Sequence, residues 1–265
     1  VTLIGANTSW AMAGYLIVGL LVLLISERYY RIILYRTSIS SKYFIPSMQG
    51  LSGQIFSYSW PFSVWGVFSW VHLSSALWSL QAFNGAELVG AFSVVLQLAM
   101  FPLIFGSSLL STFFLPIAFQ KVGDLKNRKN VTSARKILGL MIGMYILGAI
   151  ITIIIFAMFH NSLILLISNV RYTQFSYLLP WLSVSWALFY LGQLLSTFGF
   201  LVNKTSVYIM PKIVCAIIAG IGTFYLCNKL GPNGVVVGIA ISGLVYMIWC
   251  AVIVWQLRKE ESYLS

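Results

Sequence analysis

The feature that most constrains this chain is the length of its apolar runs. Residues 138–159 contain almost no polar side chain, and an α-helix needs roughly 20 such residues to cross the hydrocarbon core of a bilayer. A soluble domain carries about 25% charged residues, whereas this chain carries 8%, with 60% hydrophobic residues. The sequence therefore predicts a membrane protein.

Seven stretches of the 265-residue chain are long and apolar enough for a tilted transmembrane helix. They are residues 9–26, 55–83, 88–119, 137–159, 175–202, 207–228 and 233–257. A transmembrane β-barrel would instead show segments of about ten residues with alternating polarity. We therefore predict an all-α, polytopic helix bundle with about seven transmembrane helices.

The basic residues indicate which way these helices face. If the seven spans alternate, all of the 16 Lys and Arg residues except Arg171 and Lys229 fall on one side. The positive-inside rule assigns that side, and with it the C-terminus, to the cytoplasm. The net charge of +11 is then explained by cytoplasmic loops near anionic membrane lipids, so we predict no nucleic-acid partner.

The sequence shows no motif typical of a catalytic nucleophile or of a metal site. Cys215, Cys227 and Cys250 lie in apolar runs and show neither a CxxC motif nor a Cys/His metal spacing. The five acidic residues all map to loops or helix ends, which leaves no carboxylate inside a span. We therefore predict that the protein is not an enzyme and has no cofactor.

One stretch carries a polar face near its middle. His72 shares a helical face with Trp65 and Ser69, and also with Ser75 and Ser79, at 100° per residue. Ionisable groups inside a membrane tend to face a cavity and to mark function. The alternative is that His72 and the serines form hydrogen bonds to neighbouring helices. Both remain open from the sequence.

Four further polar residues are candidates for substrate binding. Gln97 and Gln193 lie inside apolar stretches, where pairing between helices is the alternative to lining a cleft. Lys204 and Lys212 stand at the expected cytoplasmic ends of two spans. Their alternative role is to extend toward lipid phosphates.

Two pairs of small residues spaced by four predict close helix packing. Gly139 and Gly143 form one pair, and Gly234 and Gly238 form the other, which Ser242 extends. Small side chains let transmembrane helix backbones approach one another. Such pairs say little about a substrate.

Three segments resemble the second lobe of bacterial oligosaccharide flippases, the polysaccharide branch of the multidrug/oligosaccharidyl-lipid/polysaccharide exporter superfamily. Residues 58–70 read YSWPFSVWGVFSW, with LQAF at 80–83 and VGAFSVVLQL at 89–98. Residues 230–240 read LGPNGVVVGIA and lead into an apolar helix with Tyr246 and Trp249. The similarity covers about residues 55–257. Many relatives carry an Asp-Arg type pair in the first helix of this lobe, where this chain reads SALW at 75–78.

The resemblance implies two six-helix lobes, alternating access and transport of an undecaprenyl-pyrophosphate-linked oligosaccharide across the bacterial inner membrane. Residues 1–34 would then be the last helix of an incomplete N-terminal lobe, residues 35–54 a cytoplasmic linker, and residues 55–265 the C-terminal lobe. The expected partners are the lipid-linked oligosaccharide, membrane lipids and other membrane proteins of polysaccharide assembly. Lys204 and Lys212 become candidates for the first contact with the pyrophosphate.

Other membrane functions remain as alternatives. A cation-coupled exporter of the same superfamily would be expected to hold a carboxylate within the membrane. A membrane polymerase or ligase would be expected to present a large external loop, and a seven-span receptor would carry Asp-Arg-Tyr and Asn-Pro-x-x-Tyr motifs that this chain lacks. A non-transporting membrane subunit is the remaining alternative.

Overall fold

The computed structural model describes residues 8–36, 48–123, 128–168, 170–202 and 204–263. The chain divides into two units, residues 1–55 and 56–265. The first unit contains α1 (Thr8–Arg36), a helix of 29 residues with exposed Leu, Ile and Val side chains. Of the predicted linker, residues 37–47 lie outside the described residues, and helix α2 begins at Met48.

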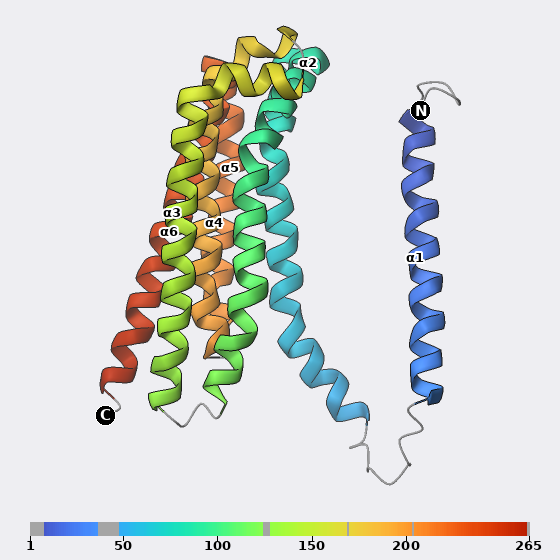
Figure 1. Cartoon of the computed structure of the whole chain (residues 1–265), viewed down its shortest axis with the longest axis vertical. Helices are drawn as coiled ribbons and strands as arrows, with labels where there is room; N and C mark the ends of the chain where they lie inside the picture. Colours follow the sequence, from blue (N-terminus) through green and yellow to red (C-terminus); the bar gives the residue numbers. More distant parts are fainter. Residues whose placement is uncertain (1–7, 37–47, 124–127, 169, 203, 264–265) are drawn as a thin grey trace. The chain divides into compact units, whose positions relative to one another are not determined.

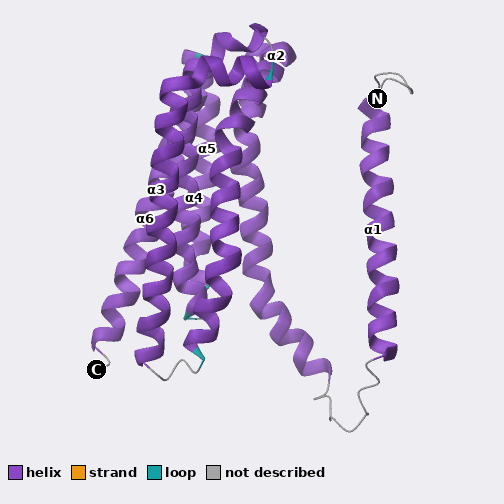
Figure 2. Ribbon diagram, viewed as in Figure 1, coloured by secondary structure: helices purple, strands orange, loops and turns teal. Residues whose placement is uncertain are grey.

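The second unit is built of helices, and the described residues contain no strand (Figure 2). The predicted all-α fold is therefore confirmed. The elements in chain order are α2 (Met48–Val122), α3 (Arg128–Ile167), the 3₁₀ helix η1 (Val170–Leu178), α4 (Leu179–Leu201), the 3₁₀ helix η2 (Ser206–Tyr208), α5 (Ile209–Leu230) and α6 (Pro232–Tyr263).

Helix α2 is interrupted at Gly85. This residue has φ 80° and ψ 172°, a conformation that essentially only glycine adopts because it has no Cβ. Figure 1 shows the chain turning back at this place, so that α2 consists of two arms. Pro102 and Pro116 lie in the second arm, where the backbone stays helical.

Five described segments are long and apolar enough to cross a membrane, and the chain is a multi-pass membrane protein. They are Ser63–Val122, Lys129–Ile167, Tyr172–Leu201, Ser206–Leu230 and Pro232–Lys259. The count differs from the seven that we predicted. One reason is that the first segment has 60 residues, which at 1.5 Å each would extend about 90 Å, three times the thickness of the hydrocarbon core. It therefore contains two of the predicted stretches, one on each side of Gly85.

Helix α4 forms the centre of the second unit. It is the most buried of the five membrane segments and contacts α3 and α6, while α6 also packs along α5. Side chains on the outer faces of the bundle, such as those of Phe113, Leu147 and Ile221, are large, apolar and exposed. This surface suits lipid contact.

The two ends of the second unit differ in charge. The Gly85 turn, η1 and the start of α6 lie at one end (Figure 1), where the Tyr177 hydroxyl donates to Asn233 Oδ1 at 3.1 Å. The end of α2, the start of α3, η2 and the end of α6 lie at the other. Of the described basic residues in this unit, all except Arg171 and Lys229 lie in the half nearer the second end, and among these the side chain of Lys212 is buried within the bundle. This is the distribution on which our orientation prediction depends.

We predict that the Gly85 turn faces the outside of the cytoplasmic membrane and that the start of α3 faces the cytoplasm. In intact cells, a membrane-impermeant thiol reagent should label Asn84→Cys and should label Lys129→Cys only after permeabilisation. The three native cysteines are buried, so background labelling should be low. The reverse pattern would overturn the orientation.

Candidate functional site

Hydroxyl groups on the first arm of α2 are held mainly by their own helix. Ser69, Ser75 and Ser79 each donate to a backbone carbonyl three or four residues earlier, over 2.8 Å. Such bonds satisfy a hydroxyl in a water-free environment without a second helix. Most of this polar face therefore needs neither water nor substrate.

Two residues of this arm connect it to α5 and α6. The Ser79 hydroxyl lies 2.9 Å from Thr223 Oγ1, and His72 Nε2 lies 3.0 Å from Ser242 Oγ. The Ser242 hydroxyl donates to the Ile239 carbonyl, which assigns the proton of the other bond to His72 Nε2. His72 is fully buried, so the structure places it in packing between helices rather than at an open cavity.

The rings of α4 surround His72. Its imidazole stacks on Phe189 with 4.1 Å between centroids and 4° between planes, and it meets the edge of Trp186 at 5.4 Å. His72 Nδ1 has no hydrogen-bond partner among the described residues. Among the described residues, the imidazole therefore has a hydrogen-bond partner for Nε2 and none for Nδ1, and aromatic rings lie on its face and at its side.

Lys212 of α5 ends among three aromatic rings. Its side chain is 1% exposed, and Nζ lies 4.1 Å from the centroid of Phe189, 4.8 Å from Tyr246 and 5.1 Å from Trp65. The negative faces of aromatic rings attract a cation, more strongly where water is excluded. We refer to Lys212, Trp65, His72, Phe189 and Tyr246 as the Lys212 cluster.

Lys212 has no acidic residue close to it along the sequence of the surrounding helices. Its Nζ has no hydrogen-bond partner among the described residues. Helices α4 and α5 contain no Asp or Glu, and those of α2 and α6 are Glu87, beside the Gly85 turn, and Glu260 and Glu261, near the end of α6. The cluster includes Tyr246, which lies near the middle of the 28-residue segment Pro232–Lys259. An unpaired ammonium at membrane depth is expensive, and such groups commonly mark a transport path.

The described residues contain no group of three His, Cys, Asp or Glu side chains that could hold a metal ion. Cys215, Cys227 and Cys250 are free and buried. The Lys212 cluster itself offers one ammonium group, one imidazole and three aromatic rings.

The structure brings together only some of the candidate binding residues. Trp65, His72 and Lys212 belong to one cluster, and Ser69 donates to the Trp65 carbonyl beside it. Gln97 is exposed on the second arm of α2, and Gln193 is half-buried in α4. They do not join the cluster.

The two lysines that we grouped at the cytoplasmic end lie in different environments. Lys204 is exposed, with its backbone N–H donating to Gly199 O at 2.8 Å. Lys212 is buried, so it does not extend to lipid headgroups. In the described conformation the two candidates for first contact with the pyrophosphate are therefore not exposed together, because aromatic rings from three helices enclose Lys212.

Sequence reasoning named Trp65 but missed Phe189 and Tyr246, the other two aromatic partners of Lys212. Phe189 was one apolar residue among many in its stretch, and Tyr246 was noted only for the resemblance. A weak signal was available, since a lysine inside an apolar stretch with no acidic residue nearby needs aromatic or backbone partners. Nothing in the sequence identified which rings these would be.

Comparison of the chain with protein-family models, curated proteins and solved structures finds no match.

Proposed function

We propose that the protein takes part in moving an undecaprenyl-pyrophosphate-linked oligosaccharide across the bacterial inner membrane. The observation that carries the proposal is Lys212, a basic side chain buried at membrane depth in a multi-pass bundle. The resemblance of residues 55–257 to oligosaccharide flippases supports it. An anionic lipid headgroup needs compensating positive charge when it leaves water.

The role of Lys212 follows from its two kinds of partner. In the described conformation three ring faces stabilise its ammonium group. A phosphate oxygen would be a stronger partner, because a charge-assisted hydrogen bond exceeds a cation–π contact. The rings come from α2, α4 and α6, so separation of these helices during alternating access would release Lys212 to the pyrophosphate.

A cation-coupled exporter is a weaker candidate for the same helices. Coupling to Na⁺ requires oxygen ligands that are usually carboxylates, and the five membrane segments contain one acidic residue, Glu87, beside the Gly85 turn. A non-transporting subunit is favoured by one observation, the complete burial of His72 against Ser242. Variants of His72 separate that function from transport.

We predict that His72→Leu reduces export of surface polysaccharide about tenfold or more, while His72→Gln retains part of it. Leucine fills the space but removes both ring nitrogens, which we expect to bond to sugar hydroxyls or water during transport. Leaving such a buried group without its partner costs about 1–3 kcal/mol. Glutamine keeps one donor and one acceptor. The measurement is surface polysaccharide at matched protein levels in cells that depend on this protein.

Ser242→Ala is the control for packing, because it removes the hydroxyl that bonds to His72 Nε2 and keeps the imidazole itself. It should leave export close to the parent level. Equal export by His72→Leu and the parent would show that His72 only packs between helices, which is the behaviour of the non-transporting subunit.

A further inference from the structure

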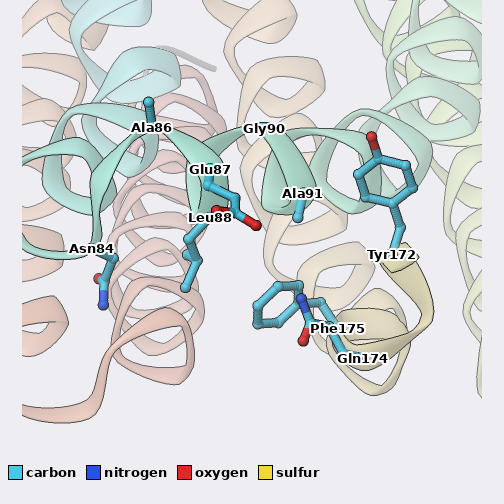
Figure 3. Close-up of a pocket in the computed structure, with 9 residues that line it drawn as sticks. All are labelled: Asn84, Ala86, Glu87, Leu88, Gly90, Ala91, Tyr172, Gln174 and Phe175. Atoms are coloured by element: carbon cyan, nitrogen blue, oxygen red, sulfur yellow. The ribbon is translucent and has the colours of Figure 1, made fainter. Parts of the chain in front are cut away.

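A second polar site lies at the Gly85 end of the bundle, away from the Lys212 cluster. It is a cavity of about 460 Å³ between the α2 turn and η1, within the range typical of small-molecule sites. Figure 3 shows the residues that line it: Asn84, Ala86, Glu87, Leu88, Gly90, Ala91, Tyr172, Gln174 and Phe175. Nothing in the function proposed above uses this cavity.

Hydrogen bonds connect both walls of the cavity to the bundle. On the α2 side, the Cys227 thiol of α5 donates to Asn84 Oδ1 over 3.5 Å. On the η1 side, the Tyr177 hydroxyl donates to Asn233 Oδ1 at the start of α6. The positive φ of Gly85 sets the direction in which residues 86–91 leave the turn. The cavity is therefore formed before any ligand arrives.

The lining combines neutral polar groups, one carboxylate and an aromatic ring. Glu87 and Leu88 point from the α2 segment toward Phe175 and Gln174 on η1 (Figure 3). The amides of Asn84 and Gln174 and the phenol of Tyr172 can each donate and accept, while the Glu87 carboxylate only accepts. Phe175 adds an apolar ring face.

This set of groups selects among ligand classes. A phosphate or carboxylate ligand would meet the charge of Glu87. A purely apolar ligand would displace water from the exposed amides of Asn84 and Gln174 without replacing its hydrogen bonds. A hydroxyl-rich ligand satisfies both the donors and the acceptors, and its C–H groups can rest on the negative face of the Phe175 ring.

We propose that this cavity binds a neutral saccharide unit at the Gly85 end of the bundle. The inference rests on the proposed function only for the source of the sugar, which would be the oligosaccharide of the exported lipid. Binding itself follows from the cavity lining and does not depend on transport.

Gly90 provides a direct test of the site. Gly90 lines the cavity, and a Cβ added there meets no atom within 4 Å, so Gly90→Leu adds volume at the lining without a clash at Cβ. Gly143 of α3 is also exposed with nothing within 4 Å, but it does not line this cavity. Gly143→Leu is therefore a matched control for the cost of Gly→Leu in a membrane helix.

The experiment is saturation-transfer NMR on the full chain in nanodiscs prepared without glycoside detergents, whose sugar headgroups would compete. The probes are maltose, lactose and N,N′-diacetylchitobiose. We expect saturation transfer to the ring protons of at least one probe, retained in Gly143→Leu and lost in Gly90→Leu. Gln174→Ala, which removes one amide without adding volume, should weaken the same signal.

Absence of transfer from all three probes, or an unchanged signal in both Gly90→Leu and Gln174→Ala, would overturn the proposal. Its failure is distinguishable from failure of the flippase proposal, because this assay involves no transport. If the chain binds a saccharide while Lys212→Met exports surface polysaccharide at the parent level, the saccharide site is supported and the transport role of the Lys212 cluster is rejected.

Discussion

Export of surface polysaccharide is expected to fall at least about tenfold in Lys212→Met, while the protein remains inserted and its melting temperature stays the same or rises. Methionine has a similar length and makes favourable contacts with aromatic rings, so the packing among Phe189, Tyr246 and Trp65 is kept. What is lost is the ammonium group. A hydrogen bond from a charged donor contributes about 1.5–3 kcal/mol, which corresponds to roughly 10- to 100-fold in binding.

The stability readout separates a functional role from a structural one. A buried ammonium carries a desolvation penalty, and replacing buried charges with apolar groups is often neutral or stabilising by about 1–4 kcal/mol. If Lys212 serves transport, export and stability should therefore move independently. Thermal unfolding of the purified protein, together with surface polysaccharide measured at matched protein levels, tests this.

Lys229→Met is the matched control on the same helix. Lys229 Nζ lies 4.6 Å from the ring centroid of Tyr225, but this lysine is exposed at the opposite end of α5. Its replacement should leave export unchanged. Parent-level export by Lys212→Met would remove the main argument for a flippase, and loss of export with a clear fall in melting temperature would assign Lys212 a packing role.

Gly238→Val is expected to destabilise the second unit by about 3 kcal/mol or more. A Cβ at this position would lie 2.9 Å from the Cα, N and Cγ2 atoms of Thr223 on α5. Overpacking usually costs about 1–3 kcal/mol, and here part of the obstacle is backbone that cannot rotate away. Separation of α5 from α6 would also disturb the contact between Thr223 and Ser79. The measurement is the melting temperature and the folded fraction on size exclusion in detergent.

Gly139→Val provides the control, because the same substitution on α3 meets nothing within 4 Å. Its effect should stay within about 0.5 kcal/mol, as for most surface substitutions. Equal melting temperatures for the two variants would contradict the close approach of α5 and α6 described here.

The two glycine pairs show where sequence reasoning stops. Both have the same spacing, and both predicted close helix packing. In the structure, Gly234 and Gly238 contact the backbone of α5, whereas Gly139 and Gly143 face open space. The spacing places two small residues on one face of a helix, but only the arrangement of helices determines whether another backbone reaches that face.

The helix count illustrates the same limit. The sequence marked two stretches around residue 85, and the structure makes them two arms of one helical run that Gly85 interrupts. Hydropathy predicts that both arms lie in the membrane, because it sums the transfer free energies of the individual side chains and needs no knowledge of their contacts. Residues 84–87, which separate the two predicted stretches, contain the turn, but only the structure shows that Gly85 makes it through its positive φ.

The sequence by itself determined that this is an all-helical, multi-pass membrane protein with basic residues concentrated at one end. These properties follow from composition and from the order of apolar and charged residues along the chain. It also identified Trp65 and His72 as candidate binding residues inside one apolar stretch, and Lys212 as a candidate at the expected cytoplasmic end of another. Only the tertiary structure decided that they meet: His72 bonds to Ser242, 170 residues away, and Lys212 ends over rings from three other helices. Contacts between residues so far apart depend on which helix faces pack together, and the periodicity of a single helix does not determine that choice.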